Sequence, residues 1–180
     1  MLNKADIRQT LIEKRSALDH ELRAQWNSTI AINLLAWLAQ NPVPVLGVYW
    51  PIRGEPALHD AYAALAKEKV QLALPVVVAK DAPLAFACWT PGDAVVVDKY
   101  GIAVPADPSF VTPDALLIPC VGFNEQRFRL GYGGGYYDRT LARQPRPQAI
   151  GIAYSCMHAN FAADPHDIAL DVLITEQGKY

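Results

Sequence analysis

ALLIPCVGF, at residues 115–123, and RLGYGGGYYDR, at residues 129–139, decide how this 180-residue chain is interpreted. The first stretch is continuously apolar, which predicts a strand buried on both faces, as in parallel sheets covered by helices. The second stretch is a glycine-rich loop that leads into a helix, predicted over residues 139–143. A strand, a glycine loop and a helix in this order favour an α/β fold, in which ligands bind at the carboxyl ends of the strands.

Four glycines occupy the five positions from Gly131 to Gly135, so Tyr132 alone carries a Cβ there. Backbone N–H groups of such a loop can close on a ligand. A helix N-terminus behind the loop adds unpaired donors and a partial positive charge, and the usual ligand is a phosphate. Arg129 and Arg139 flank the loop and raise the local positive potential. The alternative interpretation is a glycine hinge with tyrosines packed beside it.

The spacing of the glycines excludes two familiar phosphate motifs. The dinucleotide-binding fingerprint requires a glycine where Tyr136 stands, when counting begins at Gly131. The P-loop ends in Gly-Lys-Ser/Thr, which this chain lacks. The sequence therefore predicts a different kind of phosphate-binding loop.

The composition is that of an ordinary soluble globular protein, with 52% hydrophobic residues and a net charge of −2. The absence of basic tracts argues against a nucleic-acid partner, and the longest apolar run is far too short for a membrane span. No signal-type N-terminus is apparent, and the three cysteines are scattered, which favours a reducing, cytoplasmic location. We expect one domain over residues 1–180, acting as a monomer.

Apolar patterning predicts the remaining elements. Helices are expected within the first forty residues, where Asp19 precedes the second helix, and over residues 57–69. Strands are expected over residues 45–50, 70–75, 115–123, 149–154 and 171–175, with an antiparallel edge ribbon over residues 84–89. This order predicts a single three-layer α/β/α domain with a mostly parallel sheet and N-terminal helices.

Three carboxylates stand at positions where chemistry is expected. Asp138 follows the glycine loop and Asp167 precedes the last strand, and the two together could hold a phosphate-bound magnesium ion. An N-terminal strand cap is an equally good interpretation of Asp167. Glu55 lies just beyond the strand that ends at Trp50, where a buried carboxylate could accept hydrogen bonds from a heterocycle. Alternatively, Glu55 simply occupies the first turn of the following helix.

Lys4 and Arg8 are four residues apart and so share one helix face, where an anion between them would turn their repulsion into attraction. The alternative is a solvated basic face. No nucleophile–base pair stands out elsewhere in the chain. Phosphoryl transfer fits this inventory, because it needs positioning and charge neutralisation more than a protein nucleophile.

Taken together, Lys4-x-x-x-Arg8 and residues 51–55, 129–139 and 166–176 resemble, in order, the 5-formyltetrahydrofolate cyclo-ligase family, also called methenyltetrahydrofolate synthetase. The resemblance runs over nearly the whole chain, and Arg-Leu-Gly-x-Gly-x-Gly-Tyr-Tyr-Asp is its most specific motif. It implies an ATP- and magnesium-dependent ligase of folate one-carbon metabolism. This enzyme cyclises 5-formyltetrahydrofolate to 5,10-methenyltetrahydrofolate and releases ADP and phosphate.

The resemblance also implies roles for individual residues. ATP would contact Lys4, Arg8, Arg129, Leu130, Gly131, Tyr132, Gly133, Gly134, Gly135, Tyr136 and Tyr137. The folate would contact Trp50, Glu55, Tyr132, Gly133, Gly134, Gly135 and Tyr136. Asp138 and Asp167 would ligate Mg²⁺. No residue is assigned as a nucleophile.

The chain departs from the family pattern just before the loop. Where the family reads Phe-Asp-x-x-Gly, this chain has Phe123-Asn124-Glu125-Gln126-Arg127. If the family glycine serves a positive φ, Arg127 adopts a strained conformation there. The departure leaves open a nucleotide- and folate-binding paralogue without turnover. A third hypothesis is another enzyme on a similar scaffold, such as a sugar-phosphate isomerase.

Overall fold

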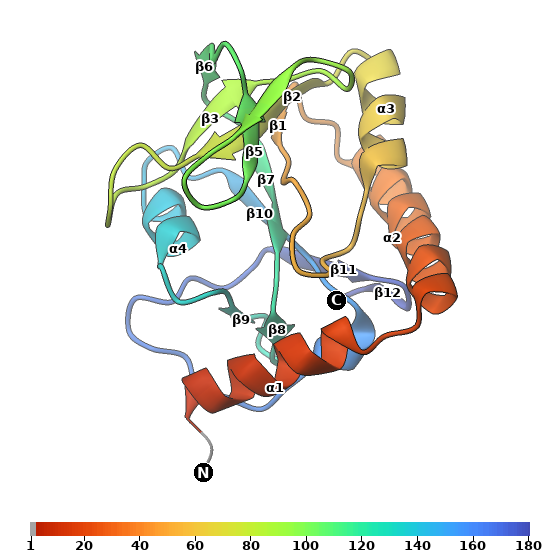
Figure 1. Ribbon diagram of the computed structural model, residues 1–180, viewed down its shortest axis with the longest axis vertical. Helices are drawn as coiled ribbons and strands as arrows, with labels where there is room; N and C mark the ends of the chain where they lie inside the picture. The colour runs from red at the N-terminus through yellow and green to blue at the C-terminus, as the bar shows by residue number, and fades with distance from the viewer. Residues whose placement is uncertain (1–2) are drawn as a thin grey trace.

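The computed structural model describes residues 3–180 (Figure 1). Residues 1 and 2, part of the N-terminal region expected to be helical, lie outside the described residues. The chain begins with two helices, α1 (Lys4–Ser16) and α2 (His20–Gln40). The side chain of Asp19 accepts hydrogen bonds from the N–H groups of Glu21 and Leu22 and so caps α2. The two predicted helices and the position of Asp19 before the second are confirmed.

Eight strands within the described residues form one sheet, in the order β12-β11-β10-β7-β1-β2-β3-β6. Its centre is parallel and contains β1 (Val45–Gly47), β2 (Gln71–Val76), β7 (Ala115–Pro119), β10 (Gln148–Ile152) and β11 (Val172–Thr175). The antiparallel strands flank this centre: β3 (Ala85–Cys88), β6 (Phe110–Val111) and β12 (Gly178–Lys179). The mostly parallel sheet is confirmed, although the ribbon over residues 84–89 is not at the edge, because β6 pairs with it.

Helices lie on both sides of the sheet, as the three-layer prediction requires (Figure 1). On one side, α2 packs against β11 and α3 (His59–Lys67) against β2. On the other side lies α4 (Tyr136–Leu141), whose Thr140 hydroxyl accepts a hydrogen bond from the Leu84 N–H. Every residue of β11 is buried, which is why its sequence is continuously apolar. No helix described over residues 3–180 is both long and apolar enough to cross a lipid bilayer.

The predicted strand over residues 115–123 is wrong in its second half, because β7 ends at Pro119 and the chain changes its hydrogen-bonding partner after Cys120. The N–H of Cys120 still donates to Ile152 of β10, but the N–H of Val121 donates to Leu130. Residues beyond that point form a separate antiparallel ribbon of β8 (Gly122–Phe123) and β9 (Arg129–Leu130). This change of partner carries the glycine loop to the carboxyl ends of the parallel strands. A second ribbon pairs β4 (Val95–Val97) with β5 (Ala103–Pro105), and the short helix η1 spans Ser155–Met157.

The predicted helix over residues 139–143 is also displaced, because α4 begins at Tyr136 and ends at Leu141. Its N-cap is Gly135, which has a left-handed backbone with φ of 67°. The left-handed residue leads the loop directly into the helix, so that Tyr136 and Tyr137 are helical.

The turn between β8 and β9 contains the two departures from the family pattern, and the side chain of Asn124 stabilises it. The side-chain oxygen of Asn124 accepts hydrogen bonds from the N–H groups of Gln126 (3.1 Å) and Phe128 (3.0 Å). Arg127 has φ of 60°, in the left-handed region that favours glycine. The strained conformation expected at Arg127 is therefore present.

Replacing Arg127 by glycine and by alanine separates backbone strain from side-chain contact. Both changes remove the guanidinium, whose Nε donates to the Leu170 carbonyl oxygen (3.2 Å), but only glycine relieves the left-handed backbone. We expect Arg127→Gly to have a free energy of unfolding about 1 kcal/mol higher than Arg127→Ala. Urea denaturation of the two variants measures the difference. Equal stabilities would show that residue 127 carries no backbone strain.

Candidate active site

Three segments that are far apart in the sequence meet at the carboxyl ends of the parallel strands. They are helix α1, the turn over residues 51–55 that follows β1, and the loop over residues 131–135 between β9 and α4. The Nε of Arg8 in α1 donates to the Gly131 carbonyl oxygen at 2.6 Å. The Tyr132 hydroxyl donates to Glu55 Oε1 at 3.0 Å. The structure therefore brings together residues that the sequence analysis assigned to the nucleotide and to the folate.

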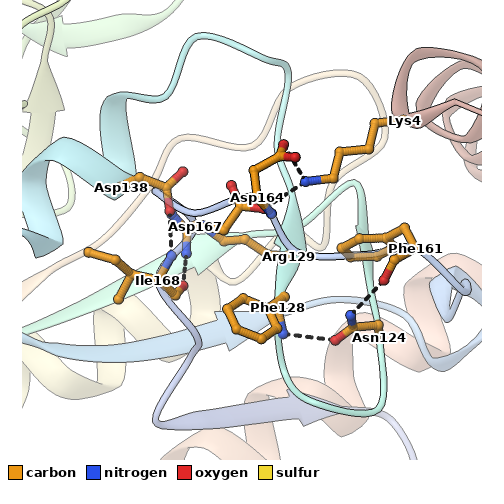
Figure 2. A network of polar contacts seen from close by, with 9 residues as sticks. All are labelled: Lys4, Asn124, Phe128, Arg129, Asp138, Phe161, Asp164, Asp167 and Ile168. Atoms are coloured by element: carbon orange, nitrogen blue, oxygen red, sulfur yellow. Dashed lines mark hydrogen bonds and ion pairs between the residues drawn. The ribbon is translucent and has the colours of Figure 1, made fainter.

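Arg129 ties together the two ends of the glycine loop (Figure 2). Its side chain is only 4% exposed, and its Nη2 lies 2.7 Å from Asp138 Oδ1, in α4. Its Nη1 donates to the Ile168 carbonyl oxygen at 2.8 Å, while the Ile168 N–H donates to the same Asp138 oxygen at 3.0 Å. The guanidinium thus joins the strand before the loop, the helix after it and the segment before β11.

The backbone conformation and the neighbouring atoms require glycine at some positions of the loop and not at others. Gly133 and Gly135 have φ of 95° and 67°, which side chains rarely adopt, and a Cβ on Gly134 would lie 2.8 Å from the Tyr136 ring. Gly131 lies outside the left-handed region, and a Cβ there would meet nothing within 4 Å. The fold itself therefore does not require glycine at residue 131. The space beside it is open to a ligand that approaches the backbone closely.

The exposed part of the loop presents unpaired donors. Within residues 3–180, the N–H groups of residues 132–135 make no hydrogen bond to another backbone carbonyl. Two carbonyls of the loop are occupied instead, because Arg8 donates to Gly131 and Arg139 Nη1 donates to Gly134 at 2.8 Å. Successive free N–H groups beside guanidinium groups attract an anion. Since α4 has only six residues, these donors contribute more than the helix dipole does.

Glu55 is held in a tight turn with its carboxylate buried. The Glu55 N–H donates to the Ile52 carbonyl oxygen at 2.9 Å, and the Ile52 N–H donates back to Glu55 Oε2 at 2.9 Å. Only 5% of Glu55 is exposed. Burial raises the pKa of Glu55, although the Ile52 N–H, the charge of Arg15 and the Tyr132 hydroxyl partly offset the shift. The turn therefore fixes the carboxylate before any ligand binds.

Tyr132 is a neutral donor in this arrangement. Burial, together with the charge of Glu55, raises the pKa of the Tyr132 hydroxyl to about 12. The Cζ of Arg53 lies 5.0 Å from the centre of its ring, at a distance typical of a cation–π contact. The orientation of Tyr132 is thus set at both its ring and its hydroxyl.

Sequence reasoning missed Arg15, which lies in the last turn of α1 and is only 1% exposed. Its Nη2 donates to the Tyr132 hydroxyl at 2.6 Å, so it belongs to the same network as Glu55. The available signal was its spacing: Arg15 follows Arg8 by seven residues and therefore shares its helix face. Adjacent to Lys14, however, it reads as part of a solvated basic surface.

Lys4 lies beside the predicted metal ligands. Its Nζ is 2.6 Å from Asp164 Oδ2 and 2.7 Å from Asp167 Oδ2. Burial alone would raise the pKa of Asp167, but the hydrogen bonds from Lys4 and the Asp164 N–H, with the charges of Lys4 and Arg129, lower it. Burial alone would lower the pKa of the Lys4 ammonium. The hydrogen bonds and charges of Asp164 and Asp167 outweigh burial and raise that pKa. Asp167 is therefore ionised at neutral pH.

The two predicted metal carboxylates fit a magnesium ion that is shared with a phosphate. Within residues 3–180, no hydrogen bond reaches Asp138 Oδ2 or Asp167 Oδ1, so each carboxylate keeps one oxygen without a protein partner. Magnesium prefers oxygen ligands and is commonly held by one or two carboxylates with phosphate oxygens and water. The described residues contain no group of three or more His, Cys, Asp or Glu side chains that could hold a metal ion alone.

The other predicted residues lie at the edges of this arrangement. Trp50 is half-buried, with its ring centre 5.0 Å from that of His59 and 5.9 Å from that of Trp89. The side chain of Leu130 is in the core and only 2% exposed. Any contact of Leu130 with ATP is therefore limited to its backbone.

Two cavities lie away from the site. A cavity of about 610 Å³ is lined by Asn124, Arg127, Cys156 and their neighbours, and one of about 450 Å³ lies between α4 and β6. Neither is lined by a residue that the sequence analysis assigned to ATP, folate or metal. The candidate site is distinguished by its unpaired donors and its fixed carboxylates.

Comparisons with known proteins identify one family over nearly the whole chain. The sequence model of the 5-formyltetrahydrofolate cyclo-ligase family matches residues 1–176. The chain is 32% identical to the 5-formyltetrahydrofolate cyclo-ligase of Mycoplasma pneumoniae, over 98% of this chain and 100% of that protein. The corresponding protein of Escherichia coli strain K12 is 27% identical, over 91% of this chain and 94% of its own length.

Two solved structures of similar proteins have the same fold. The NMR structure of 5,10-methenyltetrahydrofolate synthetase from Aquifex aeolicus matches with a TM-score of 0.85 at 30% identity, covering 99% of this chain and 92% of its own. The 5,10-methenyltetrahydrofolate synthetase of Mycoplasma pneumoniae matches with a TM-score of 0.80 at 30% identity, covering 97% and 99%. The chain therefore belongs to the 5-formyltetrahydrofolate cyclo-ligase family.

Proposed function

We propose that this chain catalyses the ATP- and Mg²⁺-dependent cyclisation of 5-formyltetrahydrofolate to 5,10-methenyltetrahydrofolate, with release of ADP and phosphate. The observation that supports this most directly is the hydrogen bond from Tyr132, in the glycine loop, to Glu55, after β1 (3.0 Å). An anion-binding loop and a buried carboxylate that can hold a heterocycle lie within one hydrogen bond of each other. Phosphoryl transfer between two bound substrates requires this proximity.

ATP binds at the glycine loop in this proposal. The unpaired N–H groups of residues 132–135 donate hydrogen bonds to its phosphate oxygens, and Lys4 and Arg8 balance the negative charge. Arg129 supports the nucleotide site indirectly, because its buried guanidinium fixes the loop through Asp138. Asp138 and Asp167 each offer one oxygen to Mg²⁺, which supplies charge neutralisation at the phosphates when it is bound.

The folate binds on the side of Glu55. A buried carboxylate, in its ionised form, is a strong acceptor for the amino and ring N–H groups of a pterin. Trp50, half-buried at the same end of β1, supplies an apolar wall, and the loop residues Tyr132 to Tyr136 face the folate from the other side. The carboxylate fixes the orientation of the ring and so places the formyl group toward the nucleotide.

The chemistry needs no nucleophile from the protein. The formyl oxygen attacks the γ-phosphorus of ATP and ADP leaves. The second folate nitrogen then attacks the formyl carbon, closes the five-membered ring, loses its proton to water and expels phosphate. Positioning of the two substrates and stabilisation of charge on the transferred phosphoryl group account for catalysis. We propose further that residues 1–180 form a single domain and that the protein acts as a monomer.

Absorbance in the methenyl-folate band tests the proposal. Wild-type protein is mixed with 5-formyltetrahydrofolate and magnesium, with and without ATP. A rise that requires ATP supports the cyclo-ligase reaction. If no rise occurs although titration shows that both ligands bind, the chain is instead a nucleotide- and folate-binding paralogue without turnover.

Gly131→Ala tests the close approach of ATP to the loop. The added Cβ meets no protein atom within 4 Å, so stability is retained, but it occupies the space proposed for the phosphates. We expect ATP to bind about tenfold more weakly, measured by calorimetric titration. Gly92→Ala is the control. Its added Cβ also meets no protein atom, but its φ of 103° lowers stability, so it shows whether a loss of stability alone weakens ATP binding. Unchanged ATP affinity in Gly131→Ala would place the phosphates elsewhere.

Glu55→Gln tests recognition of the pterin. The amide cannot accept charge-assisted hydrogen bonds from two donors, so folate affinity falls about tenfold to hundredfold while ATP affinity is retained. Because burial raises the pKa of Glu55, wild-type folate affinity falls as the pH falls toward that pKa and the carboxylate is protonated. The variant loses this dependence. Exposed Glu68→Gln is the control, and equal weakening of ATP and folate binding by Glu55→Gln would contradict the assignment.

Asp167→Asn and Asp164→Asn separate metal binding from the contact with Lys4. Both carboxylates pair with the Lys4 ammonium, but only Asp167 is assigned to Mg²⁺. We expect Asp167→Asn to raise the magnesium concentration needed for half-maximal activity about tenfold. Asp164→Asn should shift it less than twofold. The assignment fails if both variants shift it equally.

A further inference from the structure

Arg15 is a fully buried guanidinium without an ion-pair partner among the described residues. Only 1% of it is exposed, and all three of its nitrogens donate to oxygen atoms of uncharged groups. Nε donates to the Arg53 carbonyl oxygen at 3.1 Å and Nη1 to the Cys120 carbonyl oxygen at 3.4 Å, while Nη2 donates to the Tyr132 hydroxyl at 2.6 Å. Burial of an unpaired charge is costly. The negative charge that compensates it is Glu55, reached through Tyr132.

The chemistry of the three groups fixes the direction of their hydrogen bonds. A guanidinium has donors only, so the Tyr132 oxygen must accept from Arg15. The hydroxyl hydrogen is then free to point at Glu55 Oε1, 3.0 Å away. Arg15 therefore determines both where the hydroxyl lies and which way it donates.

We propose that Arg15 is a positioning residue of the cyclo-ligase site, which holds the Tyr132 hydroxyl against Glu55 and so couples the nucleotide loop to the folate-binding carboxylate. The inference rests on the proposed function and deepens it. Arg15 cannot touch either substrate, because it is buried beneath the residues that do. Its effect passes through the contact between Tyr132 and Glu55, which joins the loop over residues 131–135 to the turn after β1.

The electrostatics of Glu55 support this role. Among the charges that face Glu55, Arg15 lowers its pKa more than Arg53 does, against the opposing effect of burial. The other titratable groups that interact with it are Tyr132, Tyr49, Tyr62, Tyr137 and Cys120, which are all neutral at pH 7. Loss of the hydrogen bond from Tyr132 destabilises the ionised form of Glu55 and so raises its pKa. Folate binding is then lost at a higher pH than in the wild type.

A double-mutant cycle on folate affinity tests the proposal. Arg15→Lys keeps the charge but loses the guanidinium fork, and Tyr132→Phe removes the hydroxyl. Each single change is expected to weaken 5-formyltetrahydrofolate binding about tenfold. The double variant is expected to lose about the same tenfold, because both changes break one chain of contacts. Arg23→Lys, an arginine near the same turn at Gly54, is the control and should leave folate affinity within about twofold.

Additive losses, about hundredfold in the double variant, would overturn the proposal, because Arg15 would then act independently of Tyr132. Should Arg15→Lys fold poorly, the pH profile of Tyr132→Phe decides. A shift of the acid limb of folate binding to higher pH supports the proposal, and an unmoved limb contradicts it. A wild-type protein that neither binds folate nor forms the methenyl product contradicts the proposed function as well. An active wild type with additive losses contradicts the role of Arg15 alone.

Discussion

The ion pair between Arg129 and Asp138 is the constraint on which the rest of the site depends. A loop with four glycines has little preference of its own, so its shape must be set from its ends. Arg129 precedes the loop, Asp138 follows it, and their side chains meet at 2.7 Å with Arg129 almost wholly buried. Removing Asp138 would leave the buried charge of Arg129 uncompensated, which costs far more than an exposed pair would contribute. The same contact leaves the second Asp138 oxygen available to a metal ion.

Helix α1 is a part of the site rather than a cover for the sheet. Among its residues only Leu11 and Arg15 are buried, so hydrophobic packing alone accounts poorly for its position. Polar contacts hold it instead, from Arg8 to Gly131 (2.6 Å), from Lys14 to Cys156 (2.7 Å) and from Arg15 to Tyr132. The helix thereby delivers its basic residues to the carboxyl ends of the strands. Lys4 and Arg8, which are proposed to contact ATP, are positioned in this way although the net charge of the protein is −2.

The sequence predicted the strands of the parallel centre because burial on both faces makes them continuously apolar. It could not predict that residues 115–123 divide after Cys120, since the apolar run continues unchanged while the hydrogen-bonding partner changes from β10 to β9. The start of α4 was missed for a similar reason: Gly135 reads as loop, yet its left-handed φ of 67° makes it the N-cap. Arg15 was missed because its burial depends on Tyr132 and Glu55, which only the tertiary fold brings together.

Asn124, in the turn before the loop, shows how a departure from the family pattern can support the site. Its side-chain oxygen accepts from the turn N–H groups as a carboxylate would, but its Nδ2 also donates to the Phe161 carbonyl oxygen at 3.0 Å (Figure 2). A carboxylate cannot make that second bond. The Phe161 ring lies 5.8 Å from the Lys4 ammonium, which in turn pairs with Asp167. The amide therefore ties the turn before the glycine loop to the segment that carries the proposed metal ligand, and this link stabilises the arrangement that phosphoryl transfer needs.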